Sequence, residues 1–336
     1  MINTGVIGFG YWGPNIMRNL TANPEVNVLS VCDLAEDRLA MAKKSYPGII
    51  HTNTPDDILN DPAIDLVAII TPVFTHYEMA KKALQNGKHV FVEKPFTSNS
   101  VQAMKLIDLA EKKKLLIMID HTFLFTGAVK KLKELIDSKS IGELYYYDSV
   151  RINLGLFQHD VNVIWDLAPH DISIMNYLIP KIKVCSIHAL GADHFGRGLE
   201  DVAYLFIYSE NNFIAHFHCN WLSPVKLRRT LVAGDKKMVV WDDLEESNKI
   251  KVFDKGVEVS TKEDIYSLLV KYRTGEISTP LVENFEALKL ETSYLVDCIN
   301  NCNLHPINDG IAGLDVVKIL EASNISIKNN GKEIKF

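Results

Sequence analysis

The spacing of three glycines near the N-terminus constrains this chain more than any other feature. Gly8, Gly10 and Gly13 form a Gly-x-Gly-x-x-Gly motif that follows an apolar run and precedes a helical pattern. In this context the glycines permit a tight turn, close approach of a pyrophosphate and close packing of helix against strand. The free N–H groups at the start of such a helix face phosphate oxygens. The motif therefore predicts a dinucleotide-binding unit, with Tyr11 and Trp12 in its loop on the nicotinamide side.

A carboxylate follows the next apolar run. Asp33 comes directly after Val26–Cys32, where an acid accepts hydrogen bonds from the ribose hydroxyls of an adenosine and repels a 2′-phosphate. NAD is therefore the expected cofactor, in preference to NADP. The alternative is a plain β-turn-α unit whose glycines are incidental.

Composition limits the class of protein. A length of 336 residues favours two domains, because single cores rarely exceed about 250–300 residues. A net charge of -6 gives no case for a nucleic-acid partner. No apolar run is long enough to span a membrane, and the N-terminus leads directly into a strand-like run. The cysteines form no Cys-x-x-Cys pair, which predicts reduced thiols in a cytoplasmic protein: Cys32, Cys185, Cys219, Cys298 and Cys302.

The first part of the chain alternates strands with helices. Its apolar runs are typical of parallel strands that are covered on both faces. One helix is expected to open at Pro55, with Thr54 and Asp57 as capping residues, and another runs from about Thr75 to Gly87. We expect an α/β Rossmann domain with a doubly wound parallel sheet over residues 1–122. The expected strands are Gly5–Phe9, Val26–Cys32, Ile49–His51, Leu66–Thr71, His89–Val92 and Leu115–Asp120.

From residue 123 the pattern changes to a series of strands. We expect an α+β domain over residues 123–336 with a large open, mostly antiparallel sheet and helices on one face. The expected strands are Glu143–Asn153, Val184–Leu190, Val202–Tyr208, Phe213–Leu222, Leu227–Gly234, Lys237–Asp242 and Lys249–Phe253. The expected helices are Gly127–Asp137, about Asp166–Leu178, Glu283–Asn300 and Asp309–Lys328, the last packing back on the first domain.

The face of that sheet without helices needs a cover. Phe213–Leu222 alternates between an apolar side and a side with His216 and His218. A large half-apolar face is an aggregation risk, so we expect a homo-oligomer, dimer or tetramer, that uses it. The His216–His218 pair suggests a metal only weakly, since no third ligand is apparent, and we expect no metal site.

Two segments at strand ends carry candidate chemistry. Thr71 and Pro72 end the fourth strand, where ligands bind in open α/β sheets, and His76 follows in the next helix. We expect all three at the cofactor, although structural contacts are an equal alternative for His76. Glu93-Lys94-Pro95 ends the fifth strand, and a lysine there can stabilise a developing alkoxide. A lysine with its head in water is the alternative, and Pro95 fixes the turn, with a cis bond as one way to do so.

The third segment runs from Trp165 to Asp171. Asp166 and His170 are four residues apart, which places both on one helical face. A histidine accepts a proton near neutral pH, and a carboxylate supports it. Pro169 should restrict this segment to the first helical turn. The alternative is a helix start in which Asp166 caps and His170 packs.

Together these motifs resemble the glucose–fructose oxidoreductase, inositol dehydrogenase and rhizopine-catabolism (Gfo/Idh/MocA) oxidoreductase family, over essentially the whole chain. The specific part is Glu-Lys-Pro together with Asp-x-x-x-His. The resemblance implies a nicotinamide cofactor, and Lys94, Asp166 and His170 around the reacting carbinol. Ala168 departs from the glycine that the family often has.

Two further segments resemble a subgroup, the nucleotide-sugar 3-dehydrogenases of bacterial surface-polysaccharide pathways such as lipopolysaccharide biosynthesis. They are Gly-Tyr-Trp-Gly-Pro-Asn at 10–15 and Asn-Leu-Gly-Leu-Phe-Gln at 153–158. The resemblance implies NAD-dependent oxidation at C3 of a UDP-N-acetylhexosamine or its uronic acid. A dehydrogenase of a free sugar or inositol is the alternative, and a non-catalytic dinucleotide-sensing regulator is another.

In this scheme His170 is the base, Lys94 stabilises the oxygen and Asp166 positions the substrate or the imidazole; Lys94 and His170 could exchange roles. Arginine suits a diphosphate, but Arg228 and Arg229 are strand neighbours, so at most one faces the pocket. For Arg151, pocket and surface positions are equal alternatives. The candidate substrate-binding residues are Arg151, Asn153, Gln158, His159, Asp166, His170 and Arg228.

Overall fold

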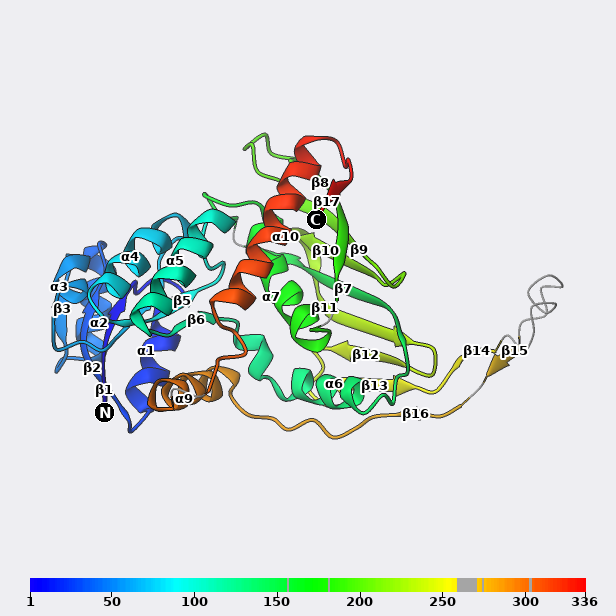
Figure 1. Cartoon of the computed structure of the whole chain (residues 1–336), viewed down its shortest axis with the longest axis horizontal. Coiled ribbons are helices and arrows are strands. Elements are labelled where there is room, and N and C mark those ends of the chain that lie inside the picture. The colour runs from blue at the N-terminus through cyan, green and yellow to red at the C-terminus, as the bar shows by residue number, and fades with distance from the viewer. Residues whose placement is uncertain (156, 181, 259–270, 274, 302–303) are drawn as a thin grey trace. The chain divides into compact units, whose positions relative to one another are not determined.

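The computed structural model describes the chain except residues 156, 181, 259–270, 274 and 302–303 (Figure 1). Leu156 of the 153–158 motif and Cys302 therefore lie outside the described residues. The chain divides into two compact units. The first comprises Met1–Phe125 with Glu286–Glu321, and the second comprises Thr126–Phe285 with Ala322–Phe336.

The first unit contains a six-stranded parallel sheet in the order β3-β2-β1-β4-β5-β6, which confirms the doubly wound Rossmann arrangement. Every residue of β4 is buried, as expected for a strand covered on both faces. The strands are β1 Ile2–Ile7, β2 Val26–Cys32, β3 Ile50–Thr52, β4 Leu66–Ile69, β5 His89–Glu93 and β6 Ile117–Asp120. The helices up to residue 125 are α1 Gly13–Ala22, α2 Glu36–Ser45, α3 Pro55–Leu59, α4 Val73–Gln85, α5 Ser100–Lys113 and the 3₁₀ helix η1 Thr122–Phe125.

Helix boundaries in this unit follow backbone and proline signals more closely than side-chain caps. Pro55 starts α3 as expected, but the Thr54 side chain makes no cap hydrogen bond. Asp57 instead pairs with the Thr52 hydroxyl, and the Thr54 N–H donates to that hydroxyl oxygen at 3.0 Å. The expectation that the side chains of Thr54 and Asp57 cap this helix is therefore wrong. Helix α4 ends at Gln85, just before Gly87, whose φ of +77° suits glycine.

The first unit also takes in α9 Ala287–Asn300 and the part of α10 Gly310–Lys328 up to Glu321. Helix α9 packs against α1 and η1. At the same end, Glu286 pairs with Arg18 on α1, with an Nη2–Oε1 distance of 2.5 Å. These contacts explain why residues 286–321 cluster with the first unit, whereas the sequence-based division assigned them to residues 123–336.

The second unit is built on a nine-stranded sheet in the order β16-β13-β12-β11-β7-β10-β9-β8-β17. Pairing is antiparallel except between β10 and β7, which confirms the expected mostly antiparallel sheet. Its strands are β7 Leu144–Leu154, β8 Val184–Ala192, β9 Val202–Ser209, β10 Ile214–Asn220, β11 Leu222–Gly234, β12 Met238–Asp242, β13 Ile250–Phe253, β16 Ile277–Ser278 and β17 Ile334–Lys335; β14 Gly256–Glu258 pairs with β15 Lys271–Arg273. Its described helices include α6 Gly127–Asp137, α7 Val163–Leu178 and the end of α10 from Ala322, and α7 packs on β7, β9 and β10.

Helix α7 begins earlier than the sequence indicated. Asn162 caps it, accepting a hydrogen bond at Oδ1 from the Trp165 N–H at 3.1 Å. Three more residues, 163–165, are therefore helical, and Pro169 lies inside the helix. The expected restriction of Pro169 to the first turn is wrong, because the cap precedes it by seven residues.

The expected strand Phe213–Leu222 is interrupted at Trp221. Strand β10 ends at Asn220 and β11 starts at Leu222, earlier than the expected Leu227. The Trp221 N–H donates to the Asp201 carbonyl and its own carbonyl accepts from the Gly155 N–H, both at 3.0 Å. These bonds turn the backbone out of the ladder, so one apolar run yields the ends of two strands.

The sheet has one covered and one open face. Ala215, Phe217 and Cys219 of β10 are almost fully buried, and α7 packs on this strand. His216 and His218 alternate with them and remain partly exposed. The described cysteines form no disulfide: Cys32, Cys219 and Cys298 are buried and Cys185 is exposed. In the described part of the chain, no helix is long and apolar enough to cross a membrane.

Candidate functional site

The loop between β1 and α1 requires glycine at two positions. Gly8 has φ +104°, and a Cβ there would lie 2.1 Å from the Ile70 carbonyl oxygen. A Cβ on Gly13 would lie 2.5 Å from the Gly8 carbonyl oxygen. In α1, all of whose residues are described, the first turn carries no acidic side chain and Trp12 gives no side-chain cap bond. The helix start is thus suited to an anion, as a dinucleotide pyrophosphate would require.

Asp33 ties this loop to the neighbouring turn. Its Oδ2 accepts from the Phe9 N–H at 2.6 Å and its Oδ1 accepts from the Ala35 N–H at 2.9 Å. A carboxylate oxygen has a second lone pair, so Asp33 can hold the loop and still accept from a ribose hydroxyl. Its position fits NAD.

Arg38 is a cofactor candidate that sequence reasoning missed. Its Nη1 lies 3.2 Å from the position that a Cβ on Gly10 would take, and its side chain is exposed. A guanidinium over the glycine loop can neutralise phosphate charge. The available signal was an arginine five residues after Asp33, on the helix that follows it.

The turn after β4 is held by side chains of its own segment and by His76. The hydroxyls of Thr71 and Thr75 lie 2.7 Å apart, and Pro72 immediately precedes α4. His76 is fully buried, with ring nitrogens 2.7 Å from the Thr71 carbonyl and 3.0 Å from the Pro95 carbonyl. His76 therefore joins two loops through structural contacts, which is the alternative that the sequence left open.

Lys94 directly follows the last residue of β5, in the turn to which His76 is bonded. The Lys94–Pro95 peptide bond is cis, which was one option from the sequence. The preceding Glu93 pairs in register with Asp120 of β6. His121 follows Asp120 and is fully buried; burial, together with the Lys94 charge, lowers the pKa of His121 to about 4 despite the opposing effect of Asp120. His121 is therefore a neutral imidazole within the electrostatic reach of Lys94.

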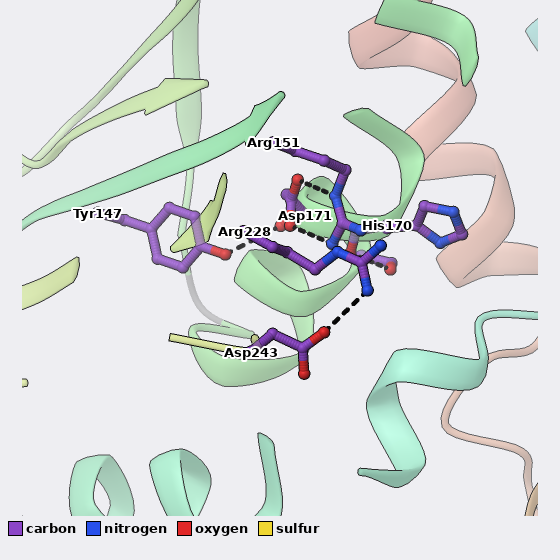
Figure 2. Close-up of polar contacts among 7 residues, drawn as sticks. Tyr147, Arg151, His170, Asp171, Arg228 and Asp243 are labelled. Carbon is purple, nitrogen blue, oxygen red and sulfur yellow. Dashed lines mark hydrogen bonds and ion pairs between the residues drawn. The ribbon is translucent and has the colours of Figure 1, made fainter. Parts of the chain in front are cut away.

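In the second unit, α7 carries Asp166 and His170 on one face. Asp166 Oδ2 accepts a hydrogen bond from Trp221 Nε1 at 3.0 Å, which fixes the carboxylate. The His170 carbonyl accepts from the Ser173 hydroxyl at 2.8 Å. Figure 2 shows the His170 ring directed away from the neighbouring Arg151–Asp171 pair. Lys94 belongs to the first unit, whereas Asp166 and His170 belong to the second.

Arg151 has a structural partner instead of the expected role in substrate binding. Its Nε and Nη2 donate to the two Asp171 carboxylate oxygens at 2.7 and 2.8 Å. Only 4 % of the Arg151 side chain and 3 % of the Asp171 side chain are exposed. The Tyr147 hydroxyl donates to the Asp171 carbonyl at 3.3 Å (Figure 2). Arg151 therefore anchors α7 to β7, and its buried guanidinium is not available to a substrate.

The two adjacent arginines of β11 face opposite sides of the sheet. Arg228 lies opposite Arg151 in the register and therefore shares its face. It donates to Asp243 Oδ2 at 2.8 Å and keeps 29 % of its side chain exposed (Figure 2). Arg229 points to the other face and pairs with Asp242. Arg228 remains the substrate candidate of the two.

The loop before α7 brings together an aromatic group and a cation that the sequence did not single out. Phe157 packs on Trp221, with ring centroids 5.5 Å apart. The Arg197 guanidinium lies 5.3 Å from the Phe157 centroid and donates to the Gln158 carbonyl. A chain of contacts thus links exposed Arg197 to Asp166 through Trp221. Of the expected polar residues nearby, Asn153 and Gln158 are half-buried and His159 is exposed.

Neither unit shows a metal centre in its described part. Among the described residues, no group of three or more histidine, cysteine, aspartate or glutamate side chains could hold a metal ion. On the open sheet face, His218 stacks on Tyr204 with centroids 4.4 Å apart, and His216 Nδ1 lies 3.6 Å from Asp148 Oδ1.

Two family models match the chain in succession. Residues 2–121 match the oxidoreductase family with an NAD-binding Rossmann fold, and residues 129–240 match the GFO/IDH/MocA C-terminal domain. The chain belongs to the GFO/IDH/MocA oxidoreductase family. This confirms the resemblance stated from Glu-Lys-Pro and Asp-x-x-x-His.

The relatives in this family have varied descriptions. An uncharacterized oxidoreductase of Escherichia coli, YdgJ, is 32% identical to this protein over a region that covers 50% of this chain and 51% of the length of YdgJ. The scyllo-inositol 2-dehydrogenase (NAD(+)) of Bacillus subtilis is 28% identical over 53% of this chain and 54% of its own. The chain thus spans about half the length of these relatives.

Solved structures share the whole fold. UDP-N-acetylglucosamine 3-dehydrogenase GnnA of Acidithiobacillus ferrooxidans superposes with a TM-score of 0.79 at 22% identity, covering 98% of each chain. GenD2 from gentamicin A biosynthesis, in complex with NAD, superposes with a TM-score of 0.83 at 19% identity, covering 100% of this chain and 96% of its own. At these identities the likeness establishes the fold.

Proposed function

We propose that this protein oxidises a sugar carbinol to a keto sugar by hydride transfer to NAD. The observation that carries the proposal is the fixed Asp166 carboxylate beside His170 on α7, in a family member that also has Lys94 at the end of β5. An imidazole supported by a carboxylate is suited to accept a hydroxyl proton.

The cofactor residues of the proposal come from the first unit. Gly8, Gly10 and Gly13 form the pyrophosphate loop, Asp33 accepts from the ribose, and Thr71, Pro72 and Glu93 lie at neighbouring strand ends. NAD, when bound, supplies the hydride acceptor. Because Arg38 lies over Gly10, phosphate charge has a cationic partner beyond the helix start.

Each catalytic side chain has a separate task in this proposal. His170 accepts the carbinol proton, and Lys94 donates a hydrogen bond to the same oxygen as negative charge develops. Asp166, held by Trp221, positions the substrate or the imidazole. In the reverse direction His170 returns the proton. Exchanged roles for Lys94 and His170 remain an alternative within the same proposal.

The substrate proposed is a UDP-N-acetylhexosamine or its uronic acid, oxidised at C3. Support comes from the motifs at 10–15 and 153–158 and from the fold shared with UDP-N-acetylglucosamine 3-dehydrogenase GnnA. Arg228 and exposed Arg197 offer guanidinium groups for a diphosphate. With this substrate, the proposed role of the protein is in surface-polysaccharide synthesis.

A free inositol or sugar is the second candidate, because one relative is scyllo-inositol 2-dehydrogenase (NAD(+)). A panel of UDP-sugars and free polyols, followed by absorbance at the NADH band, separates the two. NADH formation with UDP-N-acetylglucosamine or its uronic acid supports the proposal. Turnover of inositol alone overturns the substrate assignment, and binding of NAD without turnover of any sugar favours a regulator.

We also propose that the open sheet face is covered by a second copy of the chain. Tyr204 and Tyr208 of β9 expose 40% and 44% of their surface there. They pair across the sheet with His218 and Ile214. A contiguous half-aromatic face of this kind is typical of an interface. The expected assembly is a dimer or tetramer.

A further inference from the structure

The indole of Trp12 is held by a carboxylate from a distant strand. Trp12 is the N-cap of α1, and its Nε1 donates to Asp120 Oδ2 at 2.7 Å. The other oxygen of Asp120 accepts from the Thr122 hydroxyl. In the sheet order, β4 and β5 separate β1 from β6. The Trp12 contact therefore joins the glycine loop to a strand end beyond those that lead into Thr71 and Lys94.

A second carboxyl group supports Asp120 from α9. Glu291 is fully buried, and its Oε1 accepts from Asn308 Nδ2 at 2.9 Å. Burial, and next the neighbouring charge of Asp120 and its hydrogen bond with Glu291, raise the pKa of Glu291 well above its usual range. Glu93 acts in the same direction, and a Thr122 hydrogen bond opposes it. The same Asn308 Nδ2 donates to the carbonyl of Ile119, the residue before Asp120, at 2.6 Å. Glu291 Oε2 is buried and accepts no hydrogen bond from the described residues, so this oxygen can carry a proton and donate it to Asp120.

We propose that Asp120 and Glu291 form a buried acid pair that positions Trp12 as the wall of the glycine loop facing the nicotinamide half of the cofactor. Both are positioning residues that act through the indole. The inference rests on the cofactor part of the proposed function and is independent of which sugar is oxidised.

The arrangement needs one proton for the pair. Two ionised carboxyls in contact within a buried site repel strongly, and Glu93 adds a third carboxyl next to Asp120 in the strand register. With the proton on Glu291, Asp120 remains a charged acceptor for the indole, and a charge-assisted hydrogen bond is stronger than a neutral one. His121 directly follows β6, and its pKa of about 4 keeps it neutral near pH 7.

The placement of Trp12 matters because ligands in open α/β sheets cross the carboxyl ends of the strands. Tyr11, its neighbour in the loop, is 86% exposed, whereas Trp12 is half-buried by its contact with Asp120. If the indole were released, it would be free to move into the path of the cofactor. The acid pair therefore restricts the loop before the cofactor binds, which favours affinity through preorganisation.

The test follows the Trp12 indole N–H by ¹H–¹⁵N NMR in the full chain, and NAD affinity by calorimetry without any sugar. The chain has four tryptophans, and Trp12→Phe assigns the signal of interest. Glu291→Gln keeps a neutral donor, and Glu291→Leu removes it. Glu286→Leu is the matched control, since it breaks the Arg18 pair at the other end of the α1–α9 contact.

We expect Glu291→Leu to shift the Trp12 signal and to weaken NAD binding about tenfold, the lower end for a hydrogen bond to a charged group. Glu291→Gln and Glu286→Leu should remain within about twofold of wild type. Equal behaviour of Glu291→Gln and Glu291→Leu, or an unchanged Trp12 signal in Glu291→Leu, overturns the proposal.

If Glu291→Leu does not fold, Trp12→Phe decides. It should weaken NAD binding by a similar factor, while wild-type affinity in that variant overturns the proposal. Because no sugar is used, a wrong substrate assignment leaves this test intact. If the wild-type protein does not bind NAD, that result contradicts the proposed function itself.

Discussion

Buried titratable side chains of the first unit carry protonation states that differ from those in water. Glu291 has a raised pKa and His121 a lowered one, each with burial as the largest cause. Such shifts are linked to stability, because the folded and unfolded chains then bind different numbers of protons. Both residues can be tested by their pH dependence.

Glu291→Gln should stabilise the protein increasingly as the pH rises. In the unfolded chain Glu291 loses its proton near its usual pKa of 4.5, whereas the folded chain retains it. The contribution of Glu291 to the free energy of unfolding therefore falls as the pH rises above this pKa, by up to about 1.4 kcal/mol per pH unit. Urea denaturation of both proteins from about pH 5 to about pH 8 measures the difference. A difference independent of pH would show that Glu291 is ionised in the folded state.

His121 should make the free energy of unfolding decrease as the pH falls, which is the opposite of the pH dependence expected from Glu291. Its folded pKa of about 4 lies below the usual 6.5, so the unfolded chain takes up a proton first as the pH falls. The free energy of unfolding should therefore decrease from about pH 6.5 toward pH 4, by roughly 3 kcal/mol for the full shift. In His121→Phe this part of the decrease should be absent in the same denaturation series. An identical acid profile for the variant would refute the neutral, buried imidazole.

Among the elements, helix α7 carries residues of the proposed chemistry, and a local capping signal sets where this helix begins. Its cap, Asn162, is 6% exposed and also donates to Glu200 at 2.7 Å. The same helix presents Asp166 in its first turn and His170 one turn later. The placement of the catalytic pair therefore depends on where the helix begins.

Asn162→Ala should lower stability by about 1–2 kcal/mol through loss of the cap, and should also lower turnover. The matched control is Asn99→Ala, which removes a similar cap from α5, where Asn99 accepts from the Gln102 N–H at 2.9 Å. The control should lose comparable stability but retain turnover. Thermal melts and initial rates of NADH formation test both, and equal rates in the two variants would contradict the role given to α7.

The elements that the sequence predicted well are those with local signals. Val26–Cys32 and Gly127–Asp137 have the expected bounds, because apolar runs and helical periodicity decide them. The start of α7 was misjudged because Pro169 was read as a first-turn residue, whereas the Asn162 cap decides it. The break at Trp221 depends on bonds to Asp201 and Gly155, which no local pattern reveals.

Candidate site residues follow the same rule. The need for glycine at Gly8 and Gly13, and the place of Asp33 beside the glycine loop, could be predicted because these features are local to one β-turn-α-β unit. Arg151 was misassigned because its partner Asp171 comes from a helix after an intervening loop. Arg197 and Glu291 were missed for the same reason, since only tertiary packing brings them to Phe157 and Asp120.

At the scale of the whole molecule, the open face of the second unit's sheet remains to be covered. His188, Phe206 and His216 extend the partly exposed aromatic surface around Tyr204 and Tyr208. Covering this surface by a second copy would remove apolar area from water without changing either chain.

Tyr204→Lys with Tyr208→Lys should dissociate the assembly, because two buried charges replace aromatic contacts. Light scattering after size exclusion should show a lower mass for this double variant. Met41→Lys, at a residue of α2 that is 59% exposed, is the control and should leave the mass unchanged. A monomeric wild-type protein would exclude the proposed interface.

We propose above all that Lys94 and His170 act on one carbinol oxygen. The most direct test is NADH formation from UDP-N-acetylglucosamine or its uronic acid by wild type, Lys94→Ala and His170→Ala. We expect turnover by wild type and a loss of about 10²–10⁴ in each variant, typical of positioned acid–base groups, with NAD still bound by His170→Ala. Near-wild-type turnover in both variants would show that neither side chain acts on the carbinol oxygen.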